Sequence, residues 1–138
     1  MKSIIQKIIN KKIKICIVGI GYVGLPLAIQ LKKKKFDVFG LENNKLIIKK
    51  IMSGKSHINH IQNDDIKKIL KKNFFVTENY KLVNRADIII ICLPTPMKKN
   101  FSPDMSIVKD CFKKLKNNLN YNQTIILEST VYPGATQE

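Results

Sequence analysis

The sequence predicts an α/β domain in which a doubly wound parallel sheet is covered by helices on both faces. Short apolar runs alternate along the chain with segments whose apolar residues recur at helical spacing. The run Ile88–Leu93 is apolar throughout, which is typical of a strand buried on both faces of a parallel sheet. An earlier apolar run leads directly into a glycine-rich turn and a helical segment, an order found in Rossmann-type folds. The 138 residues suit a single domain.

The first expected strand, Ile15–Val18, ends at a glycine-rich turn. Gly19, Gly21 and Gly24 form the pattern G-x-G-x-x-G, and helical spacing of apolar residues follows. In dinucleotide-binding domains the first glycine permits the tight turn, the second lets the backbone approach a pyrophosphate, and the third lets the helix pack closely on the strand. The start of the helix then offers N–H groups to the phosphates. On the glycines alone, a turn in some other α/β protein stays open as an alternative.

The remaining segments continue the alternation of strand and helix. We expect strands at Asp37–Leu41, Phe74–Thr77, Ile88–Leu93 and Thr124–Leu127, and helices at Asn43–Ile51, at Asp64–Leu70 and from Ser102–Asp104 onward. Residues 1–12 are expected to be a basic lead, either a short amphipathic helix or a loose segment, and residues 13–138 the domain itself. Because ligands of open α/β sheets bind beyond the carboxyl ends of the strands, we expect the site among the residues that follow those ends.

Glu42 directly follows the second expected strand. An acid at this place can accept hydrogen bonds from both hydroxyls of an adenosine ribose. A 2′-phosphate would face like charge there, so Glu42 favours NAD over NADP, although the nearby Lys45 weakens this preference. The alternative is that Glu42 is a solvent-exposed acid at the start of a helix.

The net charge of +15 is compatible with an anionic partner such as nucleic acid or a membrane surface. The charge comes from lysines spread over many segments, and Arg85 is the only arginine, although arginine is better suited to bidentate phosphate contacts. We therefore interpret the lysines as solvated faces. No specific nucleic-acid partner and no membrane partner are expected, and a salt titration with DNA would separate the two interpretations.

The cysteines and histidines do not form a metal-binding pattern. Cys16, Cys92 and Cys111 are widely spaced without a C-x-x-C pair, which fits reduced thiols and a cytoplasmic location. His57 and His60 have no acidic or cysteine neighbour, so we interpret them as ordinary loop residues and expect no metal.

Three stretches carry more specific motifs than the glycines alone. They read VGIGYVGLPLA at Val18–Ala28, LPTPM at Leu93–Met97 followed by SPD at Ser102–Asp104, and LESTVYPGAT at Leu127–Thr136. Together with the acid after the second strand, these motifs resemble those of the UDP-glucose/GDP-mannose dehydrogenase family of nucleotide-sugar dehydrogenases. The residues of these motifs look most like those of the branch of the family that acts on UDP-N-acetylglucosamine or UDP-N-acetylmannosamine. The resemblance runs from about Ile13 to the last residue.

The resemblance implies an NAD-dependent oxidation of the C6 alcohol of a UDP-sugar to a carboxylate, in two hydride transfers with the aldehyde stage trapped by a cysteine thiolate. It implies roles for particular residues as well. Besides Gly19, Gly21 and Gly24, cofactor contacts are implied for Tyr22, Val23, Glu42, Thr95 and Thr136, and positions near the reacting groups for Glu128 and Thr130. The family usually has Asp where this chain has Glu42.

The resemblance also implies what this chain lacks. The catalytic lysine, the nucleophilic cysteine, the helical dimer segment and the UDP-binding domain of the family would all lie beyond Glu138. We therefore expect these residues to bind NAD without turning over a sugar, and the full-length enzyme to be a homo-oligomer that supplies precursors of surface polysaccharide. One alternative is a stand-alone regulatory module that binds NAD, and another is a dehydrogenase of related fold acting on β-hydroxy acids. Neither alternative explains the PTP and EST motifs.

Overall fold

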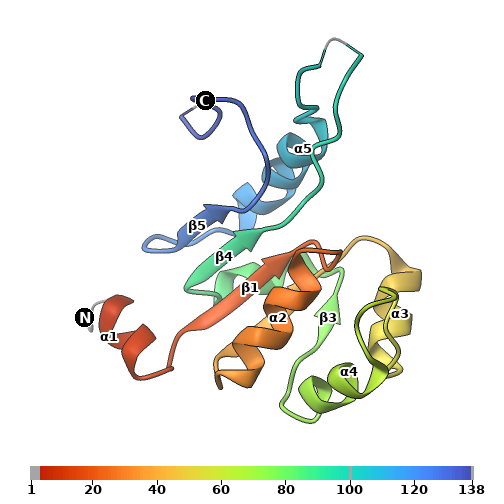
Figure 1. The fold of residues 1–138 in the computed structure, drawn as a ribbon. Coiled ribbons are helices and arrows are strands. Elements are labelled where there is room, and N and C mark those ends of the chain that lie inside the picture. The colour runs from red at the N-terminus through yellow and green to blue at the C-terminus, as the bar shows by residue number, and fades with distance from the viewer. Residues whose placement is uncertain (1–3, 100, 138) are drawn as a thin grey trace.

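The computed structural model describes residues 4–99 and 101–137. Within these residues, one sheet of five parallel strands has the order β3-β2-β1-β4-β5 (Figure 1). The strands are β1 (Lys14–Val18), β2 (Asp37–Leu41), β3 (Val76–Thr77), β4 (Ile88–Ile91) and β5 (Thr124–Leu127). The first strand, β1, lies in the middle of the sheet. The next two strands, β2 and β3, are added on one side of it, and β4 and β5 are added on the other side. The predicted doubly wound parallel sheet is confirmed.

Helices cover both faces of the sheet. The α-helices are α1 (Ile4–Ile9), α2 (Gly24–Lys33), α3 (Lys45–Met52), α4 (Asn63–Leu70) and α5 (Ser106–Leu115), and the short 3₁₀ helices are η1 (Tyr80–Arg85) and η2 (Lys116–Asn118). Successive side chains of a strand point to opposite faces. Accordingly, Ile15 and Ile17 of β1 belong to the apolar cluster under α2, α3 and α4, whereas Cys16 and Val18 belong to the cluster under η1 and α5.

The register of the sheet brings the strand ends to one edge. β1 pairs with β2 up to the pair Val18 and Leu41, and with β4 up to the pair Val18 and Ile91. β5 ends level with them, since Leu127 pairs with Ile91. The loops that follow these strands therefore leave the sheet side by side, and every residue predicted for the site except Thr136 lies in or directly beside one of these loops.

The structure moves some predicted boundaries. The helix α5 begins at Ser106 rather than near Ser102, because Met97 and Pro103 form a bridge between two antiparallel segments and the Asp104 carboxylate accepts a 3.0 Å hydrogen bond from the Ser106 N–H. The helix α3 begins two residues late because Asn44 caps it. The strands β3 and β4 are shorter than predicted, and η1 was not foreseen.

The basic lead, of which residues 4–12 are described, contains a helix docked on the domain. Ile4 of α1 packs against the cluster under α2, and the Lys7 ammonium pairs with the Asp87 carboxylate. The other Asp87 oxygen accepts a 2.9 Å hydrogen bond from the Lys14 N–H. Burial alone would raise the pKa of Asp87, but these bonds and the two lysine charges outweigh burial and lower it. Of the two alternatives for the basic lead, a short helix and a loose segment, the structure therefore supports the helix.

Across the part of the chain that the structure describes, no helix combines the length and the apolar character needed to span a lipid bilayer.

Candidate dinucleotide-binding site

The turn after β1 depends on two glycines for its own geometry. Gly19 has a φ of +89°, and a Cβ atom there would lie 2.8 Å from the carbonyl oxygen of Cys92. A Cβ atom on Gly24 would lie 1.9 Å from the carbonyl oxygen of Gly19 and 3.1 Å from a methyl group of Ile17. Alanine at either position would therefore collide with backbone. The first and third glycines of the motif are required by the packing of strand, turn and helix.

Gly21 is different, because the space beside its α-carbon is open. Apart from its two chain neighbours, no described residue would lie within 4 Å of a Cβ atom there. No side chain in the described part of the chain caps the helix α2 that follows, and its first turn contains no acidic residue. The helix α3, in contrast, is capped by Asn44, whose side-chain oxygen accepts from the N–H groups of Leu46 and Ile47. An open glycine backbone beside an uncapped helix start fits a diphosphate, which needs close approach and N–H donors.

Glu42 connects the end of β2 to the glycine turn. One carboxylate oxygen, Oε2, accepts a 3.0 Å hydrogen bond from the Ile20 N–H. The other, Oε1, accepts from the N–H groups of Asn43 at 2.9 Å and Asn44 at 3.0 Å. A carboxylate offers about four lone-pair positions, so three of them are in use here. To accept from both ribose hydroxyls, Glu42 must release at least one of these backbone contacts.

Two further residues seat the glycine turn, and the sequence interpretation missed both. The Ile20 side chain is fully buried beneath the turn. A Cβ atom on Gly40 of β2 would lie 2.6 Å from the Cδ1 atom of Ile20, so a larger residue at this position would force the Ile20 side chain to shift. A glycine inside a strand is the available sequence signal, because it often marks a place where another part of the chain approaches closely.

The loop between α3 and α4 also borders the glycine turn. Tyr22, which is 73% exposed, stacks on His60 with ring centroids 6.4 Å apart. Both ring nitrogens of His57 are buried, and among the described residues neither has a partner at hydrogen-bonding geometry. Burial lowers the pKa of His57, against the opposing effect of the Glu42 charge. The two histidines interpreted as ordinary loop residues therefore adjoin the predicted cofactor site, and no local pattern revealed this.

On the other side of β1, the loops after β4 and β5 are joined by two side-chain hydroxyls. The Thr95 hydroxyl donates a 2.7 Å hydrogen bond to the carbonyl oxygen of Thr130. The Ser129 hydroxyl donates a 2.7 Å hydrogen bond to the carbonyl oxygen of Leu93. Glu128 and Thr130, the predicted residues near the reacting groups, lie on either side of Ser129 and are exposed. The structure thus brings together the predicted residues of these two loops.

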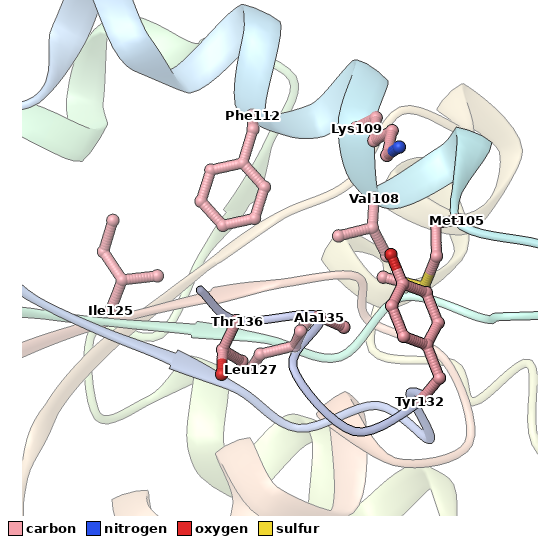
Figure 2. Close-up of a pocket in the computed structure, with 9 residues that line it drawn as sticks. All are labelled: Met105, Val108, Lys109, Phe112, Ile125, Leu127, Tyr132, Ala135 and Thr136. Carbon is pink, nitrogen blue, oxygen red and sulfur yellow. The ribbon is translucent and has the colours of Figure 1, made fainter. Parts of the chain in front are cut away.

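Thr136 lies apart from the strand-end loops. It lines a hollow of about 660 Å³ between α5, β5 and the last turn of the chain. Figure 2 shows the lining residues: Met105, Val108, Lys109, Phe112, Ile125, Leu127, Tyr132, Ala135 and Thr136. This lining is mostly apolar and includes none of the three motif glycines. The structure therefore groups the predicted residues at the strand ends, with Thr136 in a neighbouring apolar hollow.

None of the three cysteines is a reactive thiol in this structure. All three are unpaired and buried. Burial raises the pKa of Cys92 to about 11, with a further contribution from the negative charge of Glu128, and burial also raises the pKa of Cys111 to about 11. The pKa of Cys16 is raised further still, again mainly by burial. A nucleophilic cysteine needs a lowered pKa and solvent access, so these thiols do not serve that role.

The fold and the cluster of loops at its carboxyl edge define the class of protein as a Rossmann-type, dinucleotide-binding domain. Residues 13–138 match the NAD-binding domain of the UDP-glucose/GDP-mannose dehydrogenase family. The chain belongs to this family, as the motifs predicted.

Relatives and solved structures agree with this assignment. The chain is 32% identical over 128 residues to the UDP-N-acetyl-D-glucosamine 6-dehydrogenase of Pseudomonas aeruginosa, covering 93% of this chain and 30% of that protein. The GDP-mannose dehydrogenase structure from Pseudomonas aeruginosa superposes with a TM-score of 0.84 at 27% identity, covering 90% of this chain and 30% of that one. The UDP-D-ManNAc dehydrogenase of Pyrococcus horikoshii gives a TM-score of 0.82 at 31% identity with the same coverage. The chain thus spans about 30% of the length of these relatives.

Proposed function

We propose that this chain is the cofactor-binding part of an NAD-dependent nucleotide-sugar 6-dehydrogenase, which oxidises the C6 alcohol of a UDP-hexose or UDP-N-acetylhexosamine to the uronic acid. The cofactor, when bound, supplies the hydride acceptor for each of two oxidation steps. The observation that carries the proposal is the open backbone at Gly21 beside the uncapped start of α2. The names of the relatives support a UDP-N-acetylhexosamine as the sugar.

In this proposal the residues at the carboxyl edge have separate tasks. Gly19, Gly21 and Gly24, together with Tyr22 and Val23, form the backbone that receives the diphosphate. Glu42 accepts hydrogen bonds from the hydroxyls of the adenosine ribose, and its negative charge disfavours a 2′-phosphate. Thr95 and Thr136 contact the cofactor on the other side of β1. Glu128 and Thr130 serve the end of the site where the nicotinamide and the sugar meet.

The proposal assigns binding, and not turnover, to these 138 residues. Residues 13–138 are the binding unit, and residues 1–12 are a basic lead, of which the helix α1 packs against that unit. Burial of Cys16, Cys92 and Cys111 leaves no thiolate to trap an aldehyde. The whole enzyme is proposed to be a cytoplasmic homo-oligomer that serves polysaccharide synthesis, and buried thiols are compatible with a reducing compartment. Formation of NADH from UDP-N-acetylglucosamine by this chain alone would contradict this assignment.

The cofactor assignment is tested at Glu42 by titration calorimetry with NAD and NADP. Loss of a hydrogen bond to a charged group costs about 1.5–3 kcal/mol, so Glu42→Ala and the isosteric Glu42→Gln should bind NAD about 10- to 100-fold more weakly. The preference for NAD over NADP should shrink in both variants. Asp110→Asn is the matched control, because it removes a carboxylate of α5 that pairs with the exposed Lys113 and lies on the surface of the helix. Unchanged NAD affinity in both Glu42 variants would refute the ribose-binding role.

A further inference from the structure

The loops after β4 and β5 are held together by a reciprocal pair of hydrogen bonds, here termed the hydroxyl clasp. One bond runs from the Ser129 hydroxyl to the Leu93 carbonyl oxygen, and the other from the Thr95 hydroxyl to the Thr130 carbonyl oxygen, both at 2.7 Å. The bonded residues are 36 and 35 positions apart in the sequence. Each loop thus supplies one donor and one acceptor.

The clasp begins where the sheet ends. The backbone pairing of β4 with β5 runs up to Ile91 and Leu127, and the Glu128 N–H still donates a 2.8 Å hydrogen bond to the Ile91 carbonyl oxygen. Beyond this point the β4 loop contains Pro94 and Pro96, which have no N–H group to donate. The ladder therefore loses donors on that side, and the two hydroxyls continue the connection between the loops.

The clasp also reaches the glycine turn. The Cys92 N–H donates a 2.8 Å hydrogen bond to the Val18 carbonyl oxygen, which fixes the start of the β4 loop against β1. At Gly19 an added Cβ atom would lie 3.0 Å from the Cδ2 atom of Leu93, so Leu93 packs directly against the turn. The same Leu93 accepts the hydrogen bond from Ser129. The position of the β5 loop is thereby linked, through Leu93, to the turn that would hold the diphosphate.

The order of the strands indicates which part of the cofactor would lie over the two loops that the clasp connects. With the ribose acid at the end of β2 and the diphosphate turn at the end of β1, the second nucleotide half extends over β4 and β5. We propose that Ser129 is a positioning residue for this nicotinamide half: through the hydroxyl clasp it holds Glu128 and Thr130 at a fixed place relative to the glycine turn. The inference rests on the proposed function, and it adds a residue to which no binding role has been assigned.

The test compares two ligands that share the adenosine and the diphosphate. The free outer phosphate of ADP carries more negative charge than the esterified one of NAD, so each variant is compared with wild type for the same ligand and this difference cancels. ADP contains the adenosine and the diphosphate, whereas NAD adds the nicotinamide nucleoside. By titration calorimetry, Ser129→Ala should lower the affinity for NAD about fivefold, because the order that the clasp gives the β5 loop in the free protein, worth about one neutral hydrogen bond, must then be supplied when the nicotinamide half binds. The affinity for ADP should stay within about 1.5-fold of wild type, because ADP does not reach that loop. Ser129→Thr keeps the hydroxyl and should restore the NAD to ADP ratio.

Ser53→Ala is the matched control, because the Ser53 hydroxyl also donates to a backbone carbonyl, that of Lys50 at 2.8 Å, but at the end of α3. Its two affinities should equal those of wild type. If Ser129→Ala does not fold, Ser129→Cys carries the same comparison and should give an intermediate ratio, because a thiol is a weaker donor.

An equal loss of affinity for both ligands, or no loss for either, would overturn the inference and leave the proposed function standing. A wild-type chain that binds neither ligand would overturn the proposed function and the inference together.

Discussion

The same substitution to alanine should leave stability nearly unchanged at Gly21 and reduce it strongly at Gly24. In Gly21→Ala the new methyl group has no described residue within 4 Å beyond its two chain neighbours, so the free energy of unfolding of the free protein should change by about 0.5 kcal/mol or less. In Gly24→Ala the methyl group would lie 1.9 Å from the Gly19 carbonyl oxygen. Since that oxygen belongs to the backbone and cannot rotate away, the cost should reach the upper part of the overpacking range, about 3 kcal/mol. For a domain of this size that corresponds to a decrease in Tm of about 10 °C.

Binding should separate the two variants again. If the diphosphate approaches the backbone at Gly21, the methyl group of Gly21→Ala occupies that space and costs at least one amide–phosphate hydrogen bond, about 1.5–3 kcal/mol, or about 10- to 100-fold in NAD affinity. Urea unfolding followed by circular dichroism measures stability without ligand, and titration calorimetry measures NAD affinity. Wild-type NAD affinity in Gly21→Ala would refute the placement of the diphosphate. Wild-type stability in Gly24→Ala would refute the close approach of α2 to the turn.

Two further predictions concern groups outside the turn. The hydrogen bonds from Lys7 and Lys14 outweigh burial and lower the pKa of Asp87 below its ordinary 3.8, so the stability that Asp87 contributes is complete above that value and is lost as the pH falls through the lower folded value. Asp87→Asn should lower the free energy of unfolding by only about 1 kcal/mol at pH 7, because the pair is partly exposed. When urea unfolding is repeated at a series of pH values, the variant should lose less stability than wild type between neutral and acidic pH. An equal loss in both proteins would contradict this role. The thiols of Cys92 and Cys111, with pKa values of about 11, should react with a thiol reagent at pH 8 only as fast as the protein opens, and a rapid phase assigned to either thiol would show that it is accessible.

Much of the fold could be predicted because its signals are local. The strands at Asp37–Leu41 and Thr124–Leu127 are confirmed to the residue, since each apolar run is bounded by polar or turn-forming residues. The start of α5 was placed too early, because Ser102–Asp104 resembles a helix start while a bridge between Met97 and Pro103 keeps that segment extended. Pairing between two short segments depends on the return path of the chain, which local composition does not encode.

The glycines of the candidate site could be predicted from the sequence, whereas the residues that hold its loops in place could not. G-x-G-x-x-G and the acid after the second strand are recognisable because their chemistry depends on residue type. The contacts that seat and connect the loops depend instead on backbone carbonyls and on distant side chains. Ile20 needs the space left by Gly40, and Ser129 needs the carbonyl oxygen of Leu93. A carbonyl oxygen is present at every residue, so the sequence cannot mark which one will be used.

The three backbone contacts of Glu42 make ligand capture an exchange rather than a simple gain. The carboxylate has about one free lone-pair position, so it can accept a hydrogen bond from one ribose hydroxyl without losing an internal contact. A hydrogen bond from the second hydroxyl replaces one from a backbone N–H group, and its net enthalpy is the difference between the bond gained and the bond lost. The free carboxylate is therefore already held in place before ligand arrives, with little side-chain entropy left to lose. A site of this kind should gain selectivity among nucleotides more readily than it gains affinity. A nucleotide whose ribose lacks either hydroxyl would leave the internal contacts of Glu42 intact and would compete poorly for the site.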